Sequence, residues 1–185
     1  MLRIARFVKV VVTLAVSALG VGIVFLGFYE LHDFRPYLPA MKSMLNNMAA
    51  DDKEPPQNVR DFIWKAEGAA ADDFVASRLL YEARRPRRMI LWHYHSVMWG
   101  LLLPLHFTKT ERVAFYCHYL PYENGAGFAA ASQFYFGRPP DKLTVDELAT
   151  IVAIGWSPRG HSPSRHPEQL EAAKQRLLQA YTSAR

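Results

Sequence analysis

The longest apolar run of the chain extends from Val10 to Tyr29 and contains no charged residue. Its twenty residues, at 1.5 Å per helical residue, would span about 30 Å, which matches the apolar thickness of a bilayer. Arg3, Arg6 and Lys9 precede the run, and positive residues favour the cytoplasmic side. The pattern predicts a single-pass helix with a cytoplasmic N-terminus. No small-x-small cleavage site of a signal peptide follows it.

The rest of the chain has apolar residues at helical spacing. Residues 30–58 mix aromatic residues, prolines and methionines and end on a polar stretch with Pro55-Pro56, which predicts a juxtamembrane stalk and linker. Apolar positions three and four residues apart then predict a series of helices. They cover residues 59–66, 73–83, 110–119 and 128–136, a stretch that begins at Thr144 and ends at Pro158, and a last stretch from Pro167. Thr144 and Glu147 have the spacing of a capping box.

Residues 89–103 form a second strongly apolar stretch, which ends at Pro104. It is shorter than the ~20 residues that cross a bilayer, so we interpret it as a buried central helix; a segment that dips into the membrane is the alternative. No run shows sustained two-residue alternation. The predicted fold is therefore all-α: a cytoplasmic N-terminus (1–9), a transmembrane helix (10–29), a stalk and linker (30–58) and a small helical domain (59–185).

The chain has a formal net charge of +5 and a single cysteine, Cys117. One cysteine excludes an internal disulfide. The positive charge favours an anionic partner and is densest at four arginines, at positions 84, 85, 87 and 88. They are equally well explained as a solvated face or as a contact for anionic lipid or pyrophosphate, whereas nucleic acid is excluded for a domain outside the cytoplasm. His93 and His95 point to different sides of a helix, so no metal site is predicted.

Residues 110–178 resemble the second half of the glycosyltransferase family 51 domain, which occurs in bifunctional penicillin-binding proteins and monofunctional peptidoglycan transglycosylases. The resemblance consists of a glycine turn, an alanine-rich helix that ends in Tyr-Phe-Gly-Arg, a Leu-Thr-x-x-Glu helix start and a proline-rich exit. The matching residues are Tyr116, 123–127 (ENGAG), 129–131 (AAA), Gln133, 135–138 (YFGR), 143–149 (LTVDELA), Ser157-Pro158, 166–168 (HPE) and Arg176.

This resemblance implies a lysozyme-like domain that polymerises lipid II. In the family one glutamate is the general base, while a second glutamate and basic residues stabilise the donor pyrophosphate, often with a divalent cation. Glu67, at the end of the predicted helix 59–66, occupies the position of the general base, although Gly68 replaces the aspartate that normally follows. The resemblance also makes Asn124 and the arginines Arg84, Arg85, Arg87 and Arg88 candidates for substrate binding.

Several family motifs are missing. The glutamines and glycines expected around residues 74–80 are absent, and the lysine and second glutamate of the next motif fall at His93 and Ser96. An exposed glutamate at a helix end also remains an explanation for Glu67. The sequence therefore predicts a degenerate member, a pseudoenzyme that binds lipid-linked glycan or an envelope partner without full catalysis. The alternatives are an active glycosyltransferase with Glu67 as general base and a lysozyme-like hydrolase that uses one acid.

The resemblance also predicts where the protein acts. It implies the bacterial inner membrane, with the C-terminal domain outside the cytoplasm. The partners it implies are lipid II or a peptidoglycan strand, the membrane, and a protein of cell-wall synthesis. A divalent cation is implied by the family alone.

Overall fold

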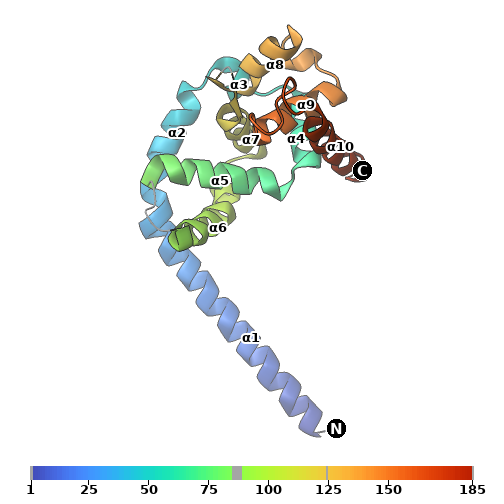
Figure 1. The fold of residues 1–185 in the computed structure, drawn as a ribbon. Helices are drawn as coiled ribbons and strands as arrows, with labels where there is room; N and C mark the ends of the chain where they lie inside the picture. The colour runs from blue at the N-terminus through green and yellow to red at the C-terminus, as the bar shows by residue number, and fades with distance from the viewer. Residues whose placement is uncertain (1, 85–88, 124, 185) are drawn as a thin grey trace. The chain divides into compact units, whose positions relative to one another are not determined.

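The computed structural model describes residues 2–84, 89–123 and 125–184, without the side chains of residues 2–8, 84 and 126. The chain divides into two compact units, residues 1–40 and 41–185 (Figure 1). The first contains α1 (Leu2–Tyr29), a π-helical turn, η1 (Glu30–Phe34), and a short 3-10 turn, η2 (Arg35–Tyr37). The domain boundaries predicted at residues 9, 29 and 58 stay predictions.

Helix α1 confirms the apolar helix predicted at the N-terminus. Among the described residues it provides the one helix long and apolar enough to cross a membrane. Its apolar side chains, such as Leu14, Val21 and Val24, are exposed along its length and are not buried within the protein. An exposed, uncharged helical surface of this length is stable in hydrocarbon, where its backbone groups pair within the helix.

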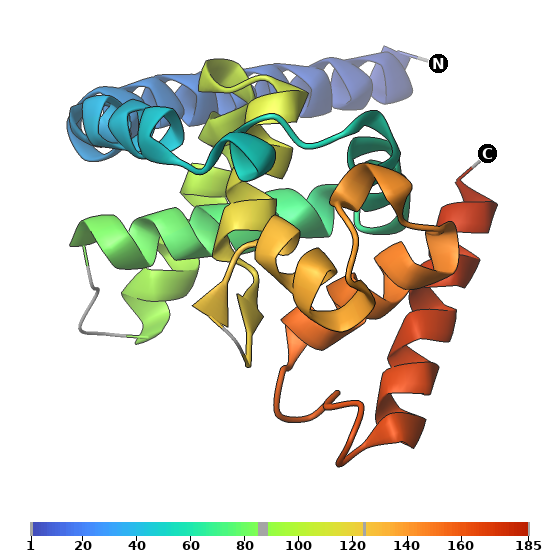
Figure 2. The ribbon, with the colours of Figure 1, turned by 90° about the horizontal axis from the view of Figure 1, so that it is seen from above.

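The second unit confirms the all-α fold (Figures 1 and 2). Its helices are α2 (Leu38–Asn47), which begins at the unit boundary, α3 (Ala50–Lys53), α4 (Gln57–Ala66), α5 (Ala69–Arg84), α6 (Met89–His106), α7 (Lys109–Tyr119), α8 (Phe128–Phe136), η3 (Pro140–Lys142), α9 (Val145–Trp156) and α10 (Pro167–Ser183). Two features differ from the prediction. The strands β1 (Pro121–Tyr122) and β2 (Gly125–Ala126) pair antiparallel, and each is too short to show alternation.

The second difference is that α6 continues through Pro104 to His106. A proline removes one backbone donor and crowds the carbonyl four residues earlier. Here that loss falls in the last turn, and Leu102, Leu103 and Phe107 around it are buried in the core. Their burial keeps the last turn helical, so tertiary packing overrides the local preference.

The centre of the domain is α7. Its residues from Val113 to Cys117 are all buried, and it contacts α3, α4, α5, α6 and α8. Helix α9 forms a second buried layer with residues 151–154 inaccessible to solvent. Helix α10 packs against both α9 and α4, and on α4 the rings of Phe62 and Tyr181 stack at 5.3 Å. These contacts hold the ends of α4, α7 and α9 in fixed relative positions.

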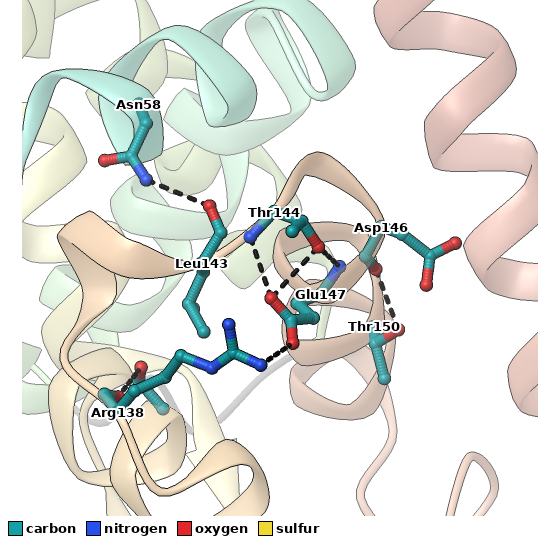
Figure 3. Close-up of polar contacts among 8 residues, drawn as sticks. Asn58, Arg138, Leu143, Thr144, Asp146, Glu147 and Thr150 are labelled. Atoms are coloured by element: carbon teal, nitrogen blue, oxygen red, sulfur yellow. Dashed lines mark hydrogen bonds and ion pairs between the residues drawn. The ribbon is translucent and has the colours of Figure 1, made fainter.

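The N-terminus of α9 is closed by the predicted capping box (Figure 3). Thr144 Oγ1 accepts from the Glu147 backbone N–H at 3.3 Å, and Glu147 Oε2 accepts from the Thr144 N–H at 2.8 Å. Arg138 pairs with the other Glu147 oxygen at 2.8 Å. Asn58 of α4 donates to the Leu143 carbonyl at 3.4 Å. The box therefore begins α9, and the bonds of Asn58 and Arg138 tie this end of the helix to α4 and to the segment that follows α8.

Replacing Thr144 by alanine is expected to lower the free energy of unfolding by about 1 kcal/mol. The reason is that one backbone donor of α9 loses its acceptor. Thermal unfolding of the full chain in detergent, followed by far-UV circular dichroism, should show a midpoint about 2–4 °C lower. Thr150→Ala is the matched control because Thr150 lies inside α9, where its hydroxyl donates to the Asp146 carbonyl. An equal loss of stability in both variants would contradict a stabilising role of Thr144 as the N-cap of α9.

Helix α8 begins next to a buried carboxylate from the segment predicted as linker. Asp52 of α3 is 6% exposed, and its Oδ1 accepts from the Ala129 backbone N–H at 3.1 Å. Burial raises the pKa of Asp52, and the Ala129 N–H lowers it by less. A Cβ at Gly127 would lie 2.7 Å from Asp52 Oδ2. Asp52 and Gly127 together therefore fix the position at which α8 starts.

Candidate active site around Glu67

The site begins with a local turn that places Glu67 at the end of α4. The Glu67 N–H still donates to the Ile63 carbonyl at 2.9 Å, so its backbone is helical. Gly68 then takes a left-handed conformation with φ +54°, which glycine adopts without steric cost. Helix α5 starts at the next residue, Ala69. The turn thus holds Glu67 between two helices.

The carboxylate of Glu67 is held by two side chains from distant parts of the sequence. Tyr116 Oη of α7 donates to Glu67 Oε1 at 2.9 Å, and Trp156 Nε1 of α9 donates to the same oxygen at 2.6 Å. Among the described residues no hydrogen bond reaches Oε2. Tyr116 is buried, whereas Trp156 is 42% exposed. The carboxylate is therefore fixed from the core side and approachable from the side of Trp156.

Burial raises the pKa of Glu67, and the hydrogen bonds from Tyr116 and Trp156 lower it by less, so the net shift is upward. Burial and the nearby Glu67 charge also raise the pKa of Tyr116 well above its usual value, which keeps its hydroxyl protonated as a donor. A half-buried carboxyl with a raised pKa is suited to accept and release a proton. Glu67 is therefore not the exposed helix-end glutamate of the alternative explanation.

Glu67→Gln is expected to make stability less dependent on pH. Because the folded-state pKa of Glu67 is raised, the folded protein binds this proton more tightly than the unfolded chain. The contribution of this group to stability is therefore present at acid pH and is lost as pH rises through the folded-state pKa. Unfolding midpoints of both proteins should agree at a pH below the pKa of a free glutamate, about 4.3, and the variant should be the more stable one at neutral pH. A wild type that gains stability relative to the variant as pH rises would contradict the raised pKa.

A second cluster lies one turn before Glu67, around Trp64. The Lys109 ammonium lies 4.5 Å from the centre of the Trp64 ring and the Arg112 guanidinium 5.0 Å from it. Arg112 also forms a largely buried ion pair with Asp72 of α5. A cavity of about 300 Å³ lies beside Trp64 and Lys109, but Glu67 is not among its lining residues. Sequence reasoning missed this cluster because its members come from three helices and share no motif.

The structure describes only some of the other residues that the sequence suggested for the site. Arg85, Arg87, Arg88 and Asn124 lie outside the described residues, and so does the side chain of Arg84, the last residue of α5. On α6 the His93 side chain is exposed, whereas the Ser96 hydroxyl is buried and has no hydrogen-bond partner among the described residues. Substrate binding by the arginines and Asn124 therefore stays a prediction. At Ser96 the structure places an uncharged hydroxyl at the position that the resemblance assigns to the family's second glutamate.

The described residues do not suit a protein-held divalent cation. Over residues 2–84, 89–123 and 125–184 no three His, Cys, Asp or Glu side chains come close enough together to hold a metal ion. Hard divalent cations need several oxygen ligands, and one oxygen of Glu67 is already engaged by Tyr116 and Trp156.

Fold and site together define a helical domain that centres on one half-buried carboxylate and follows a helix able to cross a membrane. A family model described as transglycosylase matches residues 75–182, more than half of the chain. The chain therefore belongs to the transglycosylase family, as the resemblance predicted, and its N-terminal helix makes it a membrane-anchored member. Tyr116 and Trp156 lie inside the matched region, and Glu67 lies just before it.

Several curated proteins are similar to parts of the chain. Biosynthetic peptidoglycan transglycosylase of Mannheimia succiniciproducens is 29% identical over 159 residues, which cover 79% of this chain and 62% of that protein. Penicillin-binding protein 4 of Bacillus subtilis is 35% identical over 79 residues, 42% of this chain and 13% of the relative. Penicillin-binding protein 1C of Escherichia coli is 32% identical over 81 residues, 43% of this chain and 10% of the relative. The chain thus spans less than two thirds of each of these relatives.

Proposed function

We propose that this protein binds a lipid-linked glycan such as lipid II, or a peptidoglycan strand, at Glu67 and takes part in cell-wall assembly without completing glycan polymerisation. The observation that supports binding is the Glu67 carboxylate, which α4, α7 and α9 hold through Oε1, while no described residue forms a hydrogen bond with Oε2. Sugar hydroxyls are donors, and a fixed carboxylate oxygen is a strong acceptor for them.

The composition of α6 supports the proposal of incomplete catalysis. Transfer from a pyrophosphate donor builds charge on the leaving group, which fixed cations or a metal must stabilise. Helix α6 has no Asp, Glu, Lys or Arg from Met89 to His106. The positions that the family resemblance assigns to a lysine and a glutamate are His93 and Ser96, and the Ser96 hydroxyl is buried. Binding of a sugar by Glu67 does not need a lysine or a second glutamate on α6, whereas polymerisation needs charged groups that stabilise the leaving pyrophosphate.

A second candidate function is an active glycosyltransferase in which Glu67 is the general base. The raised pKa of Glu67 and its fixation by Tyr116 and Trp156 favour it. In that reaction Glu67 Oε2 would take the proton of the acceptor sugar hydroxyl. The hydroxyl oxygen of the acceptor would attack the donor sugar, and the pyrophosphate would leave. The family resemblance and the two relatives named as penicillin-binding proteins are consistent with either function.

We also propose the bacterial inner membrane as the site of action. Three basic residues at the N-terminus, Arg3, Arg6 and Lys9, precede the apolar part of α1, and such residues favour the cytoplasmic face. This orientation would place the helical domain outside the cytoplasm, where peptidoglycan and other cell-wall synthesis proteins would be within its reach.

The experiment compares the detergent-solubilised full chain with Glu67→Gln, using purified lipid II. We expect measurable binding by the wild type, about tenfold weaker binding by the variant because a charged hydrogen bond is lost, and no polymer from either. Glu54→Gln, at an exposed position, is the control and should bind as the wild type does. Polymer from the wild type that Glu67→Gln abolishes would establish the active alternative instead. Release of sugars from peptidoglycan would indicate a hydrolase, and equal binding by all three proteins would exclude Glu67 from the site.

A further inference from the structure

Trp156, the last residue of α9, presents an aromatic ring to solvent directly beside the Glu67 carboxylate. Its indole N–H donates to Glu67 Oε1 at 2.6 Å, and 42% of the residue is exposed. Within the described part of the chain no aromatic ring or cation lies over this indole. The one polar group of the side chain is therefore satisfied, while part of its apolar ring remains open.

The other tryptophans of the chain are engaged by the protein itself. Trp99 is fully buried on the one face of α6 for which the prediction of a buried helix is right. The Trp64 ring lies under two cations of α7, at 4.5 and 5.0 Å, and the Trp92 ring contacts a tyrosine of α5 at 6.1 Å. Trp156 thus differs from all three in having a ring that a ligand can reach.

The end of α9 holds the Trp156 ring in a fixed position. Gly155 packs so closely on Leu120 that an added Cβ would lie 2.8 Å from Leu120 Cδ2. His161 Nδ1 donates to the Ala153 carbonyl at 2.6 Å and so closes the last turn of the helix. Because the backbone is packed and the indole N–H is bonded, a ligand that covers the ring orders little that is not already ordered.

A sugar ring has the chemistry that this pair of residues requires. The C–H groups on the faces of a pyranose are apolar and gain free energy when they cover an aromatic ring, and the hydroxyls at its edge are hydrogen-bond donors. No described residue forms a hydrogen bond with Glu67 Oε2. An acyl chain or an apolar side chain placed on the indole would bring no donor to this oxygen, and a carboxylate buried without a donor is costly.

We propose that Trp156 determines what the site recognises, by serving as the platform on which one sugar ring of a glycan lies while a hydroxyl of that ring donates to Glu67 Oε2. This inference rests on the proposed binding of a glycan at Glu67 and names the part of the glycan that is bound. Both contacts involve an uncharged sugar and neither involves a phosphate. A saccharide without a diphosphate is therefore sufficient for binding.

The test uses two variants that separate the ring of Trp156 from its N–H. Trp156→Phe keeps an aromatic ring and removes the donor, whereas Trp156→Gln keeps a donor and removes the ring. Binding of a linear tetrasaccharide of N-acetylglucosamine to the full chain is measured by calorimetry in a detergent without a sugar headgroup. We expect Trp156→Phe to bind nearly as the wild type does, because Tyr116 still holds Glu67 Oε1. Trp156→Gln should bind about tenfold more weakly, because the apolar contact area is lost.

The reverse order of the two variants would overturn the proposal, since Trp156 would then act only by holding Glu67. A second measurement does not depend on how well the glutamine variant folds. A sugar on the Trp156 ring excludes water from it, so the tetrasaccharide should shift the indole fluorescence of the wild type to shorter wavelength. The shift should be absent from Trp156→Phe, although this variant still binds. A shift of equal size in both proteins would place the sugar on another tryptophan and overturn the proposal.

Failure of this inference is distinguishable from failure of the proposed function. If the wild type bound lipid II but not the tetrasaccharide, the platform would be refuted and glycan binding at Glu67 would stand. The same conclusion would follow if Trp156→Gln bound the tetrasaccharide as the wild type does while Glu67→Gln bound it more weakly. If Glu67→Gln bound both ligands as the wild type does, the proposed function itself would fail.

Discussion

Replacing Gly127 by alanine is expected to lower the free energy of unfolding by roughly 3–5 kcal/mol, the largest loss that we predict for a single methyl group. Gly127 has φ +105°, a conformation that costs other residues about 1–3 kcal/mol. The new Cβ would also lie 2.7 Å from Asp52 Oδ2. The displaced Asp52 carboxylate would then lose the hydrogen bond that it accepts from the Ala129 N–H at 3.1 Å, while Asp52 stays buried.

The measurement is thermal unfolding of the full chain in detergent, where the midpoint should fall by about 10 °C. Gly137→Ala is the matched control. Gly137 also has a positive φ, +65°, but nothing lies within 4 Å of its hypothetical Cβ, so the expected loss is only about 1–2 kcal/mol. If both variants lost the same stability, the contact between Gly127 and Asp52 would not matter, and backbone strain alone would explain the result.

Replacing Arg112 by methionine is expected to cost about 3–5 kcal/mol at neutral pH. Arg112 and Asp72 form an ion pair with side-chain exposures of 8% and 14%. Burial raises the pKa of Asp72, and the Arg112 charge lowers it by less. Removing Arg112 would leave a carboxylate without its cation in a largely buried position, and would also remove the guanidinium that lies over the Trp64 ring.

Asp72 can escape this penalty by taking up a proton, so the loss in Arg112→Met should shrink as pH falls. The double variant Asp72→Asn with Arg112→Met should recover much of the stability at neutral pH, because no unpaired charge remains. Unfolding of the wild type and the two variants at acid and neutral pH measures both effects. A pH-independent loss that the double variant does not relieve would mean that Arg112 stabilises the domain through Trp64 and packing instead of through Asp72.

The proposed membrane anchor and the proposed glycan site are complementary. Helix α1 would attach the chain to the membrane. A lipid-linked glycan presents its sugars close to the membrane surface. An anchored domain would meet the sugars there, which suits a protein that binds glycan through the Glu67 carboxylate.

Features that depend on near neighbours in the chain could be predicted from the order of residues alone. The helix from Phe128 to Phe136 has the predicted bounds, and Thr144 begins α9 through the predicted capping box. The position of Glu67 at the end of α4 was also predicted. These features follow from hydrogen bonds and side-chain spacing over three or four residues, which the order of residues specifies directly.

The surroundings of these elements depend on packing between segments that are far apart in the chain. Tyr116 and Trp156 lie 49 and 89 positions from Glu67, and the packing of α7 and α9 brings them to its carboxylate. The same holds for α6, whose apolar residues lie on every side of the helix, so its sequence could not say which face would be buried. Neighbouring helices covered Trp99 and left Val97 exposed. Local sequence specifies which elements form, whereas contacts between elements distant in the chain decide what each side chain meets.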